Sequence, residues 1–129
     1  MGMNAFLVED SAVIRERLIP MLDALADVQV IGTAETEVDA ARWLGANACE
    51  VILIDLLLRQ GSGFGVLKRL QADAALPGAL RVVITNQATP EARRRCAELG
   101  ASAVFDKSRE LDELFEFLRT HQSTPLRAT

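Results

Sequence analysis

The sequence has little cysteine, no excess of positive charge and no long hydrophobic run. Its two cysteines, Cys49 and Cys96, lack CxxC spacing, which fits reduced thiols in a cytoplasmic protein better than a disulfide framework. Lys and Arg number 14 against 18 Asp and Glu, so broad electrostatic binding to nucleic acid is not expected. The longest nearly apolar run, residues 51–58, is much shorter than the roughly 20 residues of a membrane span. The N-terminus does not resemble a signal peptide.

Short apolar segments alternate with amphipathic segments along the 129 residues, a length that suits one domain. The predicted strands are 5–8, 28–34, 51–54, 80–85 and 103–105. The predicted helices are 11–25, one opened by Thr36 that runs through Leu44, one from Gly63 up to Pro77, 90–99, and 109–121. Because the strands are apolar on both faces, the pattern predicts an α/β fold with a five-stranded, doubly wound parallel sheet. Pro20 predicts a kink in the first helix.

Acidic, hydroxyl and basic residues follow the predicted strands, where open α/β sheets bind ligands. Those residues are Glu9 and Asp10 after the first strand, Asp55 after the third, Thr85 at the end of the fourth and Lys107 after the fifth. Taken singly, each also suits a helix cap, a turn or a solvated surface. Together, carboxylates that suit Mg²⁺, a hydroxyl and an ammonium around an aspartate suit phosphoryl transfer to that aspartate.

At this point the sequence resembles the receiver domain of two-component response regulators, whose single-domain members are the CheY-like proteins. Segments 55–61 and 100–107 look like the family's phosphorylation-site and final-strand segments. The resemblance runs from about Asn4 to His121 and assigns residues 1–121 to a receiver domain and 122–129 to a short C-terminal tail. It implies a flavodoxin-like (CheY-like) sheet with strand order 2-1-3-4-5.

The same resemblance implies a role for each strand-end residue. Asp55 would accept the phosphoryl group, Lys107 would pair with Asp55 and then with the phosphoryl group, and Thr85 would swing to hydrogen-bond it. The implied Mg²⁺ ligands are Asp10, Asp55 and the main-chain carbonyl of Leu57, with Glu9 reaching the metal through water. The chain would not be an enzyme with an external substrate, but a phosphoacceptor that supports its own phosphorylation and a slow dephosphorylation.

The resemblance also implies partners and a location. The phosphoryl donor would be a phosphohistidine on a sensor histidine kinase or a phosphotransfer protein. The surface formed by segments 90–99, 103–105 and 109–121 would change on phosphorylation. That surface would meet a downstream protein effector and could form a homodimer. Direct binding to nucleic acid or to a membrane is not expected, and the protein would be cytoplasmic in a bacterium.

Four positions depart from the family's pattern. Arg59 replaces a frequent proline, which predicts a more flexible loop after Asp55. Asn86 replaces a small residue and would narrow access to the site. Val104 occupies the place of the switch aromatic, with a phenylalanine one residue later, so signalling would depend on Thr85 and loop movement. Ser108 replaces a frequent proline and is predicted to cap the last helix.

Two positions that tune phosphoryl lifetime in the family are Leu57 and Gln87. Leu57 cannot orient an attacking water, although Gln87 has the groups to do so. We therefore predict slow self-dephosphorylation.

Three features outside this set have ordinary structural interpretations. The basic run Arg93 to Arg95 is expected on a solvated helix, because successive helical residues point about 100° apart. His121 is expected near the end of the last helix, and Trp43 is expected to be a partly buried packing residue.

Other functions stay open. One alternative is an aspartate-nucleophile phosphatase of the haloacid dehalogenase type, but such enzymes use a second acid two residues after the nucleophile, where this chain has Leu57. In a flavodoxin-type flavin carrier, Glu9 and Asp10 would repel the phosphate. A pseudo-receiver that is not phosphorylated is a third alternative. A receiver cut from a longer regulator with a DNA-binding or enzymatic output domain is a fourth.

Overall fold

The computed structural model describes residues 2–74 and 76–122, where five strands alternate with five helices. The strands are β1 (Met3–Val8), β2 (Val28–Ala34), β3 (Val51–Ile54), β4 (Leu80–Thr85) and β5 (Ala103–Asp106). The helices are α1 (Ala12–Ala26), α2 (Glu37–Ala46), α3 (Gly63–Ala72), α4 (Pro90–Glu98) and α5 (Leu111–Thr120). The predicted tail from residue 123 onward lies outside the described residues. Within those residues, no helix combines the length and the apolarity that crossing a membrane requires.

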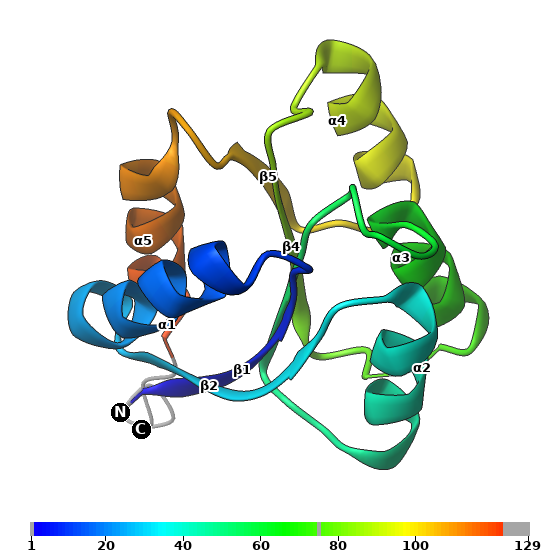
Figure 1. Cartoon of the computed structure of the whole chain (residues 1–129), viewed down its shortest axis with the longest axis horizontal. Coiled ribbons are helices and arrows are strands. Elements are labelled where there is room, and N and C mark those ends of the chain that lie inside the picture. The colour runs from blue at the N-terminus through cyan, green and yellow to red at the C-terminus, as the bar shows by residue number, and fades with distance from the viewer. Residues whose placement is uncertain (1, 75, 123–129) are drawn as a thin grey trace, which may run out of the picture.

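All five strands are parallel and lie in the order β2-β1-β3-β4-β5, which confirms the expected sheet. Helices α1 and α5 cover one face, and α2, α3 and α4 cover the other (Figure 1). The chain turns back across the sheet between β2 and β3, so the strand order reverses at the neighbours β1 and β3. Ligand sites in such sheets form outside the carboxyl ends of the strands at that reversal.

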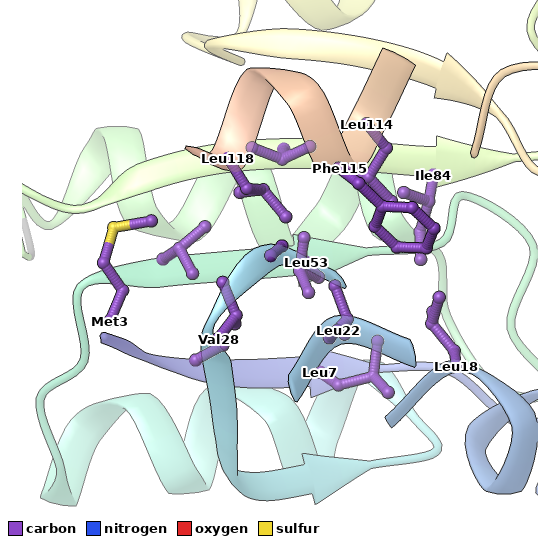
Figure 2. Close-up of a cluster of buried hydrophobic side chains, with 14 residues drawn as sticks. Met3, Leu7, Leu18, Leu22, Val28, Leu53, Ile84, Leu114, Phe115 and Leu118 are labelled. Atoms are coloured by element: carbon purple, nitrogen blue, oxygen red, sulfur yellow. The ribbon is translucent and has the colours of Figure 1, made fainter. Parts of the chain in front are cut away.

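Alternate residues of the central strands are buried on opposite faces of the sheet. Leu7 and Leu53 join the cluster under α1 and α5 (Figure 2), while Phe6 and Ile52 join the cluster under α2, α3 and α4. All four side chains are fully buried, and burying each contributes about 1.5–3 kcal/mol relative to exposure. This burial on both faces confirms the pattern from which the parallel sheet was predicted.

Trp43 packs against the sheet, as its sequence position indicated. Its ring stacks on Phe6 with centroids 4.1 Å apart and 3° between the ring planes. The stack is possible because β2 carries Gly32, where a Cβ would lie 2.5 Å from the indole nitrogen of Trp43. Cys49 and Cys96 are both buried and free, and burial raises the pKa of the Cys49 thiol to about 11. Both thiols therefore act as small apolar packing groups.

Two predicted helix caps are confirmed and one is wrong. Thr36 accepts a hydrogen bond from Asp39 N at 3.1 Å, and the hydroxyl of Thr89 does the same for α4. Ser108 does not cap α5: the cap position is Glu110, and its side chain makes no capping bond. The carboxylate of Asp106 accepts from Ser108 N at 2.8 Å, which holds Ser108 in a turn before the helix. Helix α1 continues through Pro20 as one element from Ala12 to Ala26.

Candidate functional site

The sheet ladder brings the first, third and fifth strand ends to one place. Val8 pairs with Ile54 across β1 and β3, so Glu9 and Asp55 follow neighbouring residues. Asp55 N donates to Val8 O at 3.0 Å, which extends the ladder by one residue. On the other side, Lys107 N donates to Thr85 O at 3.1 Å. Backbone hydrogen bonds therefore fix the main chain that carries the predicted site side chains of Glu9, Asp55, Thr85 and Lys107.

Lys107 joins two of the acids directly. Its Nζ lies 2.7 Å from Asp55 Oδ2 and 2.8 Å from Glu9 Oε1. All three side chains are at least nine-tenths buried, since Lys107 is 10%, Asp55 6% and Glu9 1% exposed. The pairing with Asp55 follows the expectation, whereas the equally short contact with Glu9 was missed. No local sequence signal could have revealed it, because the two residues are 98 positions apart.

Burial and neighbouring charges shift the pKa values of both Glu9 and Lys107. Burial raises the pKa of Glu9, the charge of Asp55 raises it further, and the hydrogen bond from Lys107 opposes both. For Lys107, burial alone would lower the pKa, but the hydrogen bonds to Asp55 and Glu9 outweigh burial and raise it. The ammonium is therefore charged at neutral pH and is the main compensating charge for the buried acids.

Glu9, Asp10 and Asp55 form a set of oxygen ligands. One carboxylate oxygen from each lies within 4.8 Å of the others. Asp10 is half-buried and, within the described residues, makes no hydrogen bond or ion pair. Among the residues that the structure describes, the one donor to Asp55 Oδ1 is Leu57 N, at a long 3.3 Å. Hard carboxylate oxygens with spare acceptor capacity fit a hydrated divalent cation such as Mg²⁺, so this set could hold one.

Thr85 lies at the same edge with its side chain fully buried. Its Oγ1 accepts a hydrogen bond from Gln87 N at 3.1 Å, and it pairs with Asp106 across β4 and β5. Asn86, the next residue, is exposed and accepts a 3.0 Å hydrogen bond from Ser108 Oγ. This bond connects the loop after β4 to the loop after β5.

Comparison with known proteins decides the family. The family model described as response regulator receiver domain matches residues 5–119. The chain belongs to this family. It is 33% identical over 101 residues to protein-glutamate methylesterase/protein-glutamine glutaminase 5 of Myxococcus xanthus, covering 78% of this chain and 28% of that protein.

Two solved receiver structures agree with this assignment. The phosphorylated cyanobacterial phytochrome response regulator RcpA is 26% identical, with a TM-score of 0.73 over 93% of this chain and 91% of that chain. The response regulator domain of CheB from Thermotoga maritima, at 18% identity, shows the shared fold, with a TM-score of 0.79 over 93% of this chain and 96% of that chain. The receiver spans little more than a quarter of the Myxococcus relative, and the methylesterase activity in that name belongs to that protein.

In this receiver domain, Arg93 fills the region beside the missing switch aromatic. Val104 belongs to the cluster under α2, α3 and α4, whereas Phe105 packs on the opposite face against Phe117, with ring centroids 5.6 Å apart. Phe105 therefore cannot replace an aromatic residue at 104. Instead Arg93 donates to Val104 O at 3.0 Å and pairs with Glu110 at 2.8 Å.

The expectation that the run from Arg93 to Arg95 lies on a solvated helix holds for Arg94 and Arg95, which are exposed, whereas Arg93 is only partly exposed and is held by its neighbours. Besides the bonds above, Arg93 Nε donates to Ala88 O at 3.2 Å in the loop after Thr85. Arg95 lies over the Phe64 ring, 4.1 Å from its centroid. A cation over an aromatic face is attracted by the ring quadrupole. The run connects α4 to its neighbours instead of facing solvent alone.

Arg59, at the frequent proline position, is held by charge. Its guanidinium lies 3.1 Å from Glu35, which also pairs with Arg15 of α1 at 2.8 Å. Gln60 O in the same loop accepts a hydrogen bond from Glu37 N at 3.1 Å. These contacts connect the loop to α1 and α2, and its greater flexibility stays a prediction.

Proposed function

We propose that Asp55 is the phosphoacceptor of this receiver domain. The observation that carries the proposal is the buried contact between Asp55 and Lys107 beside Glu9 and Asp10, because a carboxylate is poised there with a cation at 2.7 Å. An Asp55 oxygen attacks the phosphorus of a phosphohistidine whose other ring nitrogen carries a proton, the phosphorus–nitrogen bond breaks, and the imidazole leaves as a neutral ring. The product is an acyl phosphate on Asp55, so atoms and charge balance without a further reactant.

The remaining strand-end residues support this transfer. The proposed Mg²⁺ ligands are Asp10, Asp55 and the carbonyl of Leu57, with Glu9 acting through water. The metal, when bound, neutralises charge on the phosphoryl oxygens. Lys107 shifts from the Asp55 carboxylate to a phosphoryl oxygen. The buried hydroxyl of Thr85, which accepts from Gln87 N in this structure, leaves that donor and hydrogen-bonds the phosphoryl group.

We further propose how the domain communicates. The donor is a sensor histidine kinase or a phosphotransfer protein in the bacterial cytoplasm. It would meet two exposed apolar residues beside the site, Val13 at 63% and Leu57 at 59% exposure. The output surface is α4, β5 and α5, where Arg93 links all three elements, and it meets a downstream protein or a second copy of the receiver. Neither nucleic acid nor a membrane is proposed as a direct partner.

Incubation with acetyl phosphate and Mg²⁺, followed by intact mass measurement, tests the phosphoacceptor. The wild-type protein is expected to gain one phosphoryl group and Asp55→Ala to gain none. Asp112→Ala, which removes an exposed acid from α5, serves as the matched control and is expected to behave as wild type. A wild-type protein that gains no mass, with acetyl phosphate and with candidate kinases, would instead support a pseudo-receiver.

Leu57→Asn is expected to shorten the lifetime of the acyl phosphate several-fold. The exposed leucine offers no hydrogen bond to an incoming water, whereas an amide beside Asp55 can orient one. Decay of the phosphorylated protein after removal of acetyl phosphate gives the rate. Ile31→Asn, at a half-exposed position on the edge strand β2, controls for general loss of stability. A longer lifetime in Leu57→Asn would contradict the prediction.

A further inference from the structure

We infer that Glu37 is a positioning residue for the phosphoacceptor loop, residues 56–62, and thereby for the metal ligand at Leu57. The inference rests on the proposed function, because it concerns how the chain holds the Leu57 carbonyl beside the acids. It assigns to a carboxylate of α2 the restraint that a proline at position 59 would otherwise supply.

Glu37 holds the phosphoacceptor loop with both its backbone and its side chain. Its backbone N–H donates to Gln60 O at 3.1 Å, and its Oε1 accepts from Ser62 N at 3.0 Å. The other carboxylate oxygen accepts from Arg69 Nε of α3 at 3.2 Å. The side chain is only 20% exposed. One acid therefore joins the first turn of α2 to the loop and to the helix that follows it.

Two glycines make this close approach possible. A Cβ on Gly61 would lie 2.3 Å from Glu37 Cβ, and a Cβ on Gly65 would lie 2.2 Å from Glu37 Oε1. Gly61 also has a φ of +74°, which other residues adopt only with strain. The backbone on either side of Ser62 is thus shaped around this carboxylate, which a solvated acid at a helix start would not require.

The restraint passes from Ser62 to the site in two short steps. Ser62 pairs with Leu57 in an antiparallel bridge, and Gly63 N donates to Leu56 O at 3.0 Å. Leu57 N in turn donates to Asp55 Oδ1. Holding Ser62 therefore holds Leu57, whose carbonyl is the proposed ligand, against the acids at the strand ends.

The simpler explanation is that Glu37 only favours the positive end of the α2 dipole. Asp39 allows the two to be separated, because it lies in the same first turn and its side chain pairs with Arg42 instead of the phosphoacceptor loop. Asp39→Ala removes an equal charge from the same helix end. Glu37→Gln removes the charge but keeps an oxygen that can accept from Ser62 N.

The experiment measures the Kd for Mg²⁺ by calorimetry and the rate of phosphorylation by acetyl phosphate as Mg²⁺ is varied. Glu37→Ala is expected to raise the Kd about tenfold, the lower end of the range for residues that orient metal ligands. The rate at saturating Mg²⁺ is expected to stay near wild type, because the acids and Lys107 are intact. Glu37→Gln and Asp39→Ala are both expected to stay within about twofold of wild type.

The outcomes separate this inference from the proposed function. Wild-type protein that binds Mg²⁺ but gains no phosphoryl group would end the proposed function, while the Kd values would still decide the role of Glu37. Equal Kd values for Glu37→Ala and Asp39→Ala, or no Mg²⁺ binding by the wild type, would overturn the inference. Should Glu37→Ala not fold, Glu37→Asp keeps the charge but draws the carboxylate back from Ser62 N by one methylene, and it is expected to raise the Kd in the same direction, by less; an unchanged Kd would overturn the inference.

Discussion

Replacing Lys107 with methionine is expected to lower the free energy of unfolding by about 3–5 kcal/mol at neutral pH without divalent cations. The ammonium compensates Glu9 and Asp55 at 2.8 and 2.7 Å, and both acids are almost fully buried. Without it, two like charges share a site with little water. Urea unfolding in the presence of a chelator measures the change. Lys68→Met, at an exposed position on α3, is the matched control, with an expected effect within about 0.5 kcal/mol.

The loss in the Lys107 variant is expected to depend on pH in a defined direction. Burial raises the pKa of Glu9 above 4.5, so the stability linked to its protonation is present below that value and lost as pH rises through the raised pKa. The pKa of Lys107 is raised above 10.5 by its acidic partners despite burial, so its contribution in the wild type persists until strongly alkaline pH. The deficit should therefore shrink in acid, where Glu9 is neutral, and should also shrink when Mg²⁺ is added. A deficit of equal size in acid and at neutral pH would mean that packing of the lysine stem, not charge, had been lost.

The fold followed from the sequence because its determinants are local. The apolar run at 51–54 can be buried only between two layers. Thr36 and Thr89 cap helices by bonds to backbone groups three residues ahead, within reach of any chain that turns there. Once strands and crossovers alternate, the handedness of the crossovers gathers the strand ends at one edge. That is why the sequence alone predicts that Asp55 and Lys107 lie together.

What the sequence did not predict depends on long side chains that reach between elements. Arg93 contacts Glu110 across 17 positions, and Glu37 contacts Ser62 across 25. The charge and length of these residues suit solvent equally well, so only the packed structure selects their partners. The wrong prediction of a cap at Ser108 has a different cause. The carboxylate of Asp106 accepts from the backbone N–H groups of Ser108 and Arg109 and so holds this segment in a turn before the helix begins.

Gly63→Ala is expected to disturb both stability and phosphorylation, although it adds only one methyl group. A Cβ at this position would lie 2.2 Å from the carbonyl oxygen of Asp55 and 2.9 Å from Ile54 Cγ2. Because the nearest atom belongs to the backbone of Asp55 itself, relief requires a shift of either Asp55 or the start of α3. We expect a loss of about 1–3 kcal/mol in the free energy of unfolding, as for other overpacked sites.

The same shift should slow phosphorylation by a larger factor than the loss of stability alone would suggest. The reason is that a displacement of about 1 Å can reduce a rate about 100-fold. Urea unfolding and the rate of mass gain with acetyl phosphate and Mg²⁺ measure the two effects on one sample. Gly45→Ala is the matched control: it lies in α2 with no atom within 4 Å of an added Cβ. It should gain about 0.5–1 kcal/mol from helix propensity and keep the wild-type rate. If Gly63→Ala matched wild type in both measurements, α3 would be free to move away from β3, and the close packing of Gly63 would have no part in placing Asp55.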